Sequence, residues 1–141
     1  MVGRGTVIAI VEDDAPVRKA LARLLDALSF QTRTYDSARA FLAALPGGLP
    51  QCLIVDLQMP EMTGLELQRH LERTGFTIPT IVITAHDDAG VREQCERAGA
   101  VAFLLKPVAE SNLVSAINDA LSIPATAAGQ PGVAGGNQSP R

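Results

Sequence analysis

The sequence predicts an α/β fold, namely a flavodoxin-like, doubly wound parallel sheet of five strands in the order 2-1-3-4-5 with five helices. Short apolar runs alternate strictly with segments of helical periodicity, as in parallel sheets whose strands are joined by crossover helices. The run Cys-Leu-Ile-Val at 52–55 is apolar throughout, which is typical of a strand buried on both faces. It leads directly into Asp56. A charge at the end of a buried strand is costly unless it interacts with a group outside the strand.

The first half of the chain supplies three strands and two helices, each with a local justification. Residues 6–11 are a β-branched run that predicts the first strand. Asp14 can cap a helix in which aliphatic residues recur at helical spacing from Val17 to Leu28. Residues 30–35 predict a more polar strand at a sheet edge, and Ser37 caps a short helix through Leu45. The third strand is the run that ends at Asp56.

The second half continues the alternation. The expected elements are a helix at 64–73, a strand at 78–83, a helix at 89–98, a strand at 100–105 and a helix at 110–121. Pro79 lies at the entry of its strand, where a missing N–H matters least. From Ser122 the composition shifts to Pro, Gly, Ala, Ser and Gln. We therefore expect one domain over residues 1–121 and a flexible tail over residues 122–141.

The composition is that of an ordinary soluble globular protein. The net charge of −3 does not indicate a nucleic-acid-binding surface, and no apolar run approaches the roughly 20 residues that span a bilayer. The N-terminus lacks the apolar run and cleavage site of a signal peptide. Cys52 and Cys95 have neither metal nor redox spacing, so we expect buried thiols in a reducing compartment. These features predict a cytoplasmic protein that contacts neither nucleic acid nor membrane.

Polar residues stand at the ends of four of the five expected strands. Asp13 and Asp14 come after the first strand, Asp56 after the third, Thr84 after the fourth and Lys106 after the fifth. The carboxyl ends of parallel strands share one edge, and ligands bind there where the strand order reverses. Carboxylates that crowd together repel one another unless a cation lies among them, and Mg²⁺ prefers oxygen ligands. A lysine and a hydroxyl opposite suit a phosphoryl group, so the pattern predicts phosphorylation of Asp56.

Four segments at these strand ends resemble the receiver domain of bacterial two-component response regulators. They are Val11-Glu-Asp-Asp14, Val55-Asp-Leu-Gln-Met-Pro-Glu-Met-Thr-Gly64, Ile83-Thr-Ala85 and Phe103-Leu-Leu-Lys-Pro107. Each segment alone is weakly specific, but all four in order across residues 6–121 are a strong signal. The stretches 56–67 and 83–88 are similar to those of the FixJ-type subgroup.

This resemblance implies a role for each matching residue. Asp56 would accept a phosphoryl group from a sensor histidine kinase or a histidine phosphotransfer protein. Asp14 would bind Mg²⁺ directly, Asp13 would bind it through water, and Gln58 would bind it through its backbone carbonyl. Pro60 and Gly64 would shape the turn that leads from Asp56 into the next helix.

The resemblance also implies a conformational switch. Lys106 would pair with the phosphoryl group beside a cis peptide bond to Pro107. Thr84 would turn inward to hydrogen-bond the phosphoryl group, and Phe103 would follow it into the vacated space. The surface of the fourth helix, the fifth strand and the fifth helix would change as a result. Phe103 lacks the hydroxyl group that a tyrosine would offer at this position.

Under this resemblance the chain is a signalling phosphoacceptor and not an enzyme, with intrinsic self-phosphorylation and dephosphorylation chemistry only. A phosphoaspartate enzyme of the haloacid-dehalogenase type is the alternative from another class. Such an enzyme needs a carboxylate two residues after its nucleophile, where this chain has Gln58. The output stays open between a downstream protein partner and a missing effector domain, as in the receiver half of a truncated transcriptional regulator. No DNA-binding domain of roughly 60 residues fits after Leu121.

Each residue also has an ordinary structural explanation when it is taken alone. An acidic run can be a solvated turn, Thr84 a common strand-end residue, and Phe103 a core side chain. His70 and His86 are not at metal spacing and are expected to be exposed. The outward charges expected on the fourth helix fit a dimer formed on phosphorylation or simply a solvated face; they are Arg92, Glu93, Glu96 and Arg97. Only the joint arrangement at the strand ends favours the functional interpretation.

Overall fold

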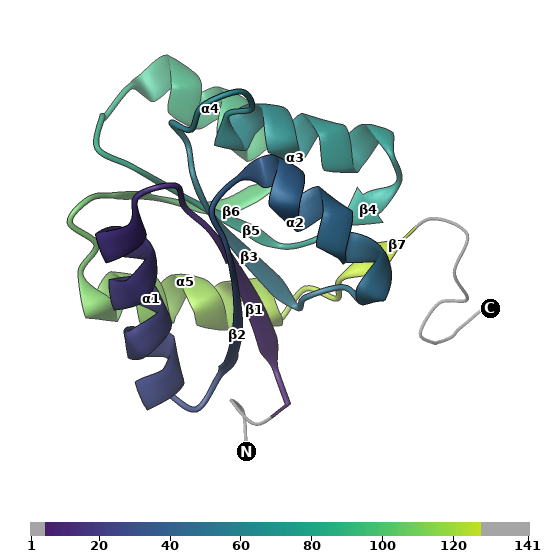
Figure 1. Cartoon of the computed structure of the whole chain (residues 1–141). Coiled ribbons are helices and arrows are strands. Elements are labelled where there is room, and N and C mark those ends of the chain that lie inside the picture. The colour runs from purple at the N-terminus through teal and green to yellow at the C-terminus, as the bar shows by residue number, and fades with distance from the viewer. Residues whose placement is uncertain (1–4, 128–141) are drawn as a thin grey trace.

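The computed structural model of the chain describes residues 5–127 and contains a five-stranded parallel sheet between two layers of helices (Figure 1). The strands of this sheet are β1 (Val7–Val11), β2 (Gln31–Tyr35), β3 (Cys52–Asp56), β5 (Thr80–Thr84) and β6 (Ala100–Leu105). Their spatial order is β2-β1-β3-β5-β6, which is the predicted 2-1-3-4-5 when only these five strands are counted. The predicted fold class is therefore confirmed.

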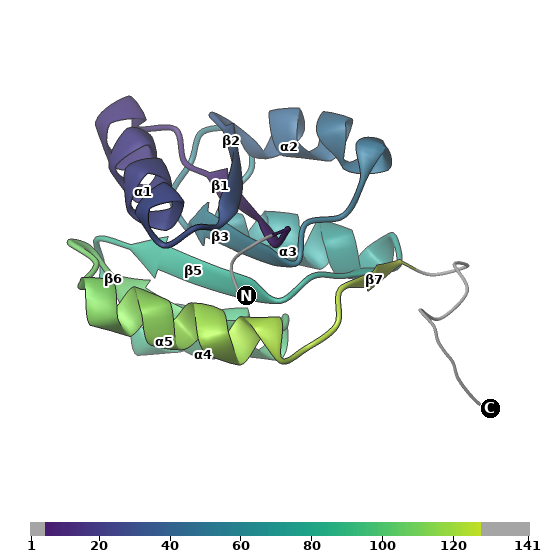
Figure 2. The same cartoon turned by 90° about the horizontal axis from the view of Figure 1, so that it is seen from below.

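The helices divide between the two faces of the sheet (Figure 2). They are α1 (Ala15–Ala27), α2 (Ala38–Ala44) with the short 3-10 helix η1 (Leu45–Gly47), α3 (Gly64–Arg73), α4 (Ala89–Arg97) and α5 (Glu110–Leu121). Helices α1 and α5 pack on one face, while α2, α3 and α4 pack on the other (Figures 1 and 2). These bounds agree closely with those predicted from periodicity.

Strand β3 shows why the central strands are rich in apolar residues on both faces. All five of its residues are buried, because alternate side chains enter the two separate cores. Cys52 and Ile54 pack toward α1 and α5, whereas Leu53 and Val55 pack toward α2, α3 and α4. The edge strand β2, by contrast, is partly exposed along its whole length, as its polar sequence predicts.

Side-chain caps begin three of the helices. Ser37 accepts a hydrogen bond from the N–H of Ala40 at the start of α2, as expected, and Asp88 caps α4. Thr63 and Glu66 form a reciprocal capping box at the start of α3. Asp14 occupies the N-cap position of α1, but its side chain makes no capping hydrogen bond.

A small second sheet was not anticipated from the sequence. Strand β4 (Phe76–Thr77) pairs antiparallel with β7 (Thr126–Ala127), so the chain folds back after α5 beside the end of α3 (Figure 1). Phe76 and Thr77 precede the predicted fourth strand, whose ladder begins at Thr80 and not at residue 78. The expected tail thus contains an ordered strand at 126–127, while its remainder at 128–141 lies outside the described residues.

Within residues 5–127, no helix has both the length and the apolar character that crossing a membrane would need.

Candidate functional site

The carboxyl ends of β1, β3, β5 and β6 bring the predicted polar residues together. Asp56 is the last residue of β3 and Thr84 the last residue of β5. Lys106 follows β6 directly, and Glu12 and Asp13 follow β1. Residues separated by 50 positions in the chain thereby come into direct contact, since Lys106 and Asp56 are hydrogen-bonded. This edge of the sheet is the candidate site.

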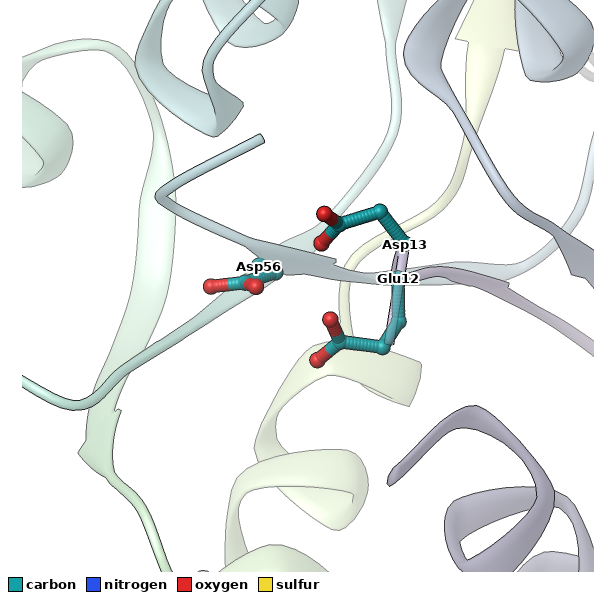
Figure 3. A group of neighbouring side chains, drawn as sticks. All are labelled: Glu12, Asp13 and Asp56. Carbon is teal, nitrogen blue, oxygen red and sulfur yellow. The ribbon is translucent and has the colours of Figure 1, made fainter. Parts of the chain in front are cut away.

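Three carboxylates gather at the centre of the site (Figure 3). Glu12, Asp13 and Asp56 each offer an oxygen atom, and these atoms lie within 4.8 Å of one another. Glu12 and Asp56 are buried, whereas Asp13 is exposed. Such a set of hard oxygen donors matches the ligands that Mg²⁺ prefers in proteins.

Asp14, which the sequence interpretation assigned as the direct metal ligand, is not a member of this carboxylate group among the described residues. It stands at the N-cap of α1, and its backbone N–H donates to Oε2 of Glu12 at 3.1 Å. Glu12 was missed as a site residue because it belongs to an undifferentiated acidic run. The alternation of side chains along β1 indicates that Glu12 points inward. Ile8 and Ile10 enter the same core, and Glu12 is the next residue in that series.

Lys106 connects the two buried carboxylates. Its Nζ lies 2.9 Å from Oε1 of Glu12 and 3.1 Å from Oδ2 of Asp56. Its backbone N–H donates to the carbonyl of Thr84 at 2.7 Å, which ties it to the neighbouring strand end. The peptide bond from Lys106 to Pro107 is cis, as the resemblance implied.

Burial and pairing act in opposite directions on these groups. Desolvation raises the pKa of Glu12 to about 7, although the hydrogen bond from Lys106 works to lower it and the nearby Asp56 raises it further. For Lys106, burial by itself would lower the pKa, but the hydrogen bonds to Glu12 and Asp56 outweigh burial, and the pKa is raised. The ammonium group therefore stays charged as the counter-ion of the site.

Gln58 links Asp56 to Thr84 through two hydrogen bonds. The backbone N–H of Gln58 donates to Oδ1 of Asp56 at 3.2 Å. The hydroxyl of Thr84 donates to Oε1 of Gln58 at 3.4 Å and accepts from the N–H of His86 at 3.2 Å. Thr84 is fully buried, so its hydroxyl lies inside the protein beside the Asp56 loop.

The loop after Asp56 requires glycine at position 64 for a steric reason. A Cβ atom at Gly64 would lie 2.8 Å from the carbonyl oxygen of Asp56 and 3.1 Å from Cα of Leu57. The N–H of Gly64 also donates to the carbonyl of Leu57 at 2.9 Å, which closes the loop. Pro60 accepts from the N–H of Met62 at 2.7 Å in a tight three-residue turn. Both predicted loop residues thus lie at close backbone contacts.

Phe103 lies on β6 and is half-buried against the core formed with α2, α3 and α4. The guanidinium carbon of Arg92 on α4 stands 5.1 Å from the centroid of the Phe103 ring. The sequence interpretation named Arg92 only as an outward charge, because no local pattern places an α4 side chain over a β6 ring.

The remaining singled-out residues have ordinary positions. His86 is exposed, as expected, whereas His70 is half-buried. Cys52 and Cys95 are free buried thiols, and burial raises the pKa of Cys52 to about 12. Among residues 5–127, the group of possible metal ligands consists of carboxylates and includes none of these cysteines and histidines.

Comparison with known proteins identifies the family of the chain. The family model described as the response regulator receiver domain matches residues 8–118. The transcriptional regulatory protein FixJ of Rhizobium meliloti is 42% identical over 113 residues, which cover 80% of this chain and 55% of FixJ. The transcriptional regulatory protein TdiR of Thauera aromatica is 36% identical over 121 residues, which cover 86% of this chain and 53% of TdiR. The chain thus spans about half the length of these relatives.

Solved structures show the same likeness in three dimensions. The crystal structure of FixJ-N matches with a TM-score of 0.78 at 39% identity, covering 84% of this chain and 95% of that one. A response regulator receiver protein from Burkholderia phymatum matches with a TM-score of 0.72 at 41% identity, covering 87% and 98%. The chain therefore belongs to the response regulator receiver domain family and is of the FixJ type.

Proposed function

We propose that this receiver domain accepts a phosphoryl group on Asp56 from a sensor histidine kinase or a histidine phosphotransfer protein. The observation that supports this most directly is the setting of the Asp56 carboxylate. It is buried at the end of a central strand, hydrogen-bonded to Lys106 and adjacent to two further carboxylates. A buried carboxylate with a lysine partner and a cation site beside it suits nucleophilic attack on phosphorus.

In the transfer, an Oδ atom of Asp56 attacks the phosphorus atom of a phosphohistidine. A P–O bond to Asp56 forms, the P–N bond to the histidine breaks, and the imidazole nitrogen keeps the electron pair. Lys106 already lies 3.1 Å from Asp56 Oδ2, so its ammonium group can pair with the oxygens of the incoming phosphoryl group. Its partner Glu12 keeps the ammonium at this position while Asp56 changes charge.

The donor set fits a bound Mg²⁺ ion. Asp13, Asp56 and the backbone carbonyl of Gln58 would hold it, with Glu12 close enough to contribute. When bound, the ion would neutralise negative charge on the carboxylates and on the phosphoryl oxygens. Asp14 is disfavoured as a direct ligand because it does not share the carboxylate group.

The switch part of the proposal uses Thr84 and Phe103. The Thr84 hydroxyl is buried one strand away from Asp56 and contacts Gln58 in the Asp56 loop. A phosphoryl group on Asp56 offers this hydroxyl a stronger, charged acceptor. Thr84 would then move toward Asp56, Phe103 would follow, and the surface of α4, β6 and α5 would change. This surface would carry the response to a partner or to a second copy of the chain.

The relatives suggest what the output is. FixJ and TdiR are named transcriptional regulatory proteins, and this chain matches about half of each. The receiver half of a transcriptional regulator is therefore the second form of the proposal, beside a receiver that acts through a separate protein partner. Either form would act in the cytoplasm.

Mass spectrometry after incubation with acetyl phosphate and Mg²⁺ tests the proposal. The wild-type chain should gain one phosphoryl group, and Asp56→Asn should gain none. If the wild type gains none, or if Asp56→Asn gains as much, phosphorylation of Asp56 is refuted.

A matched pair of variants tests the metal ligands. Asp13→Asn should require a higher Mg²⁺ concentration for the same phosphorylation rate, whereas Asp14→Asn should stay near the wild type. The reverse result would restore Asp14 as the direct ligand and would contradict the geometry of the carboxylate group.

A further inference from the structure

Arg92 connects three parts of the molecule through one guanidinium group. It projects from α4, and its Cζ atom stands 5.1 Å from the centroid of the Phe103 ring on β6. Its Nη2 atom also donates to Oδ1 of Asp87 at 3.1 Å, in the loop between β5 and α4. One side chain thus contacts the strand that carries Phe103 and the loop that follows Thr84.

The contacts of Arg92 lie next to the residues that the proposed switch would move. Asp87 is three residues beyond Thr84, and Phe103 is the register partner of Val82, two residues before Thr84. Arg92 and Phe103 also line one surface hollow of about 370 Å³, which continues along β6 to the start of α5. The guanidinium group therefore lies across the two segments that the proposed switch would move.

The chemistry of Phe103 makes such a contact informative. A phenylalanine ring has no hydroxyl group, so hydrogen bonding cannot hold it in either position. The planar guanidinium of an arginine stacks well on the face of an aromatic ring and can pair with a carboxylate at the same time. Arg92 has both kinds of partner, namely the Phe103 ring and the Asp87 carboxylate.

We propose that Arg92 is a positioning residue that holds Phe103 and the β5–α4 loop in the arrangement seen here and so opposes switching. This inference rests on the proposed function, in which Phe103 and Thr84 move when Asp56 is phosphorylated. A contact present in only one of two states shifts the equilibrium between them by its own free energy. The usual strength of an exposed cation–π pair corresponds to about a two- to fivefold change in an equilibrium constant. The contact of Arg92 with the ring should therefore shift the equilibrium between the two states by this factor.

The effect of this shift on ligand binding follows from linkage. A phosphoryl mimic on Asp56 that favours the switched state must bind more tightly when the unswitched state is weakened. We therefore expect Arg92→Gln to bind beryllofluoride, in the presence of Mg²⁺, about two- to fivefold more tightly than the wild type. Arg92→Lys keeps the charge but loses the planar group that stacks on the ring, so its affinity should lie between those of the wild type and Arg92→Gln.

The experiment is a titration of the whole chain with beryllofluoride and Mg²⁺, followed by backbone amide NMR. Arg97→Gln is the matched control, because it removes the same charge from α4 but pairs with Glu93 and not with Phe103. In a Phe103→Leu background, Arg92→Gln should lose most of its effect, since the ring contact is already absent. Urea denaturation of each variant separates a change in switching from a general loss of stability.

The outcomes separate the two proposals. If the wild type does not bind beryllofluoride, or if Asp56→Asn binds it equally, the proposed function fails. If the wild type binds but Arg92→Gln binds equally or more weakly, only the role of Arg92 is overturned. An equal effect of Arg92→Gln in the wild-type and Phe103→Leu backgrounds also overturns it, because the effect would then not act through the ring.

Discussion

The buried carboxyl group of Glu12 makes the stability of the folded chain depend on pH in an unusual direction. Its ordinary pKa is 4.5, and burial raises the pKa to about 7 in the folded protein, with Lys106 opposing the rise and Asp56 adding to it. The folded state thus holds this proton more tightly than the unfolded state. The stabilisation from the protonated form is fully present below about pH 4.5 and is lost as the pH rises through about 7.

The size of the effect follows from the two pKa values. The difference between 4.5 and about 7 corresponds to at most about 3 kcal/mol, at 1.36 kcal/mol for each tenfold change in proton affinity. Glu12 is fully buried but its partner Lys106 is partly exposed, so this figure is an upper bound. Glutamine has the shape of the protonated side chain and cannot ionise. Glu12→Gln should therefore gain stability relative to the wild type as the pH rises from 5 to 7.5.

The assay is urea denaturation of the wild type and of Glu12→Gln at several pH values, without Mg²⁺. The free energy of unfolding of the variant minus that of the wild type should increase with pH by up to about 3 kcal/mol. Glu72→Gln on α3 controls for the loss of one exposed carboxylate. A constant difference between pH 5 and 7.5 would refute the reasoning, and a decreasing difference would show that pairing with Lys106 outweighs desolvation.

Three further predictions concern the loop, a cap and a thiol. Gly64→Ala should lower the free energy of unfolding by about 1–3 kcal/mol, because the new Cβ would lie 2.8 Å from the carbonyl oxygen of Asp56. Gly47→Ala is the control in the same urea experiment, because a Cβ atom there meets no atom within 4 Å. An equal loss of stability in both variants would contradict the steric argument. Thr63→Ala should cost about 1 kcal/mol, because the capping box of α3 is lost; hydrogen exchange at the start of α3 should increase, and unchanged exchange there would count against this role. Burial raises the pKa of Cys52 to about 12, so a thiol reagent at pH 8 should modify this residue only after unfolding; rapid modification of the folded chain, mapped by mass spectrometry, would show that the strand opens.

Local periodicity was sufficient to predict most of the fold. The fully buried strands β3 and β5, the polar edge strand β2 and the helical spacing between them reflect burial, and burial is what the side-chain pattern records. The small sheet of β4 and β7 could not be predicted in this way. Its two-residue strands are too short to show a period, and their pairing depends on where the chain goes after α5.

The candidate site was predictable to the extent that it lies at strand ends. Asp56, Thr84 and Lys106 each stand where an apolar run stops, and parallel strands must bring such ends together. The choice among Glu12, Asp13 and Asp14 was different, because all three follow the same strand. Backbone pairing of Glu12 with Tyr35 continues the extended chain by one residue, which turns the Glu12 side chain inward toward Lys106.

The sequence by itself therefore determined the order of the elements, the two buried faces of the sheet and the edge at which the site lies. These features follow from the period of the side-chain pattern and from the common direction of parallel strands. Only the tertiary structure decided which carboxylates share the site and that Arg92 lies over Phe103. Such contacts depend on how separate elements pack against one another, and no local pattern in the chain records that packing.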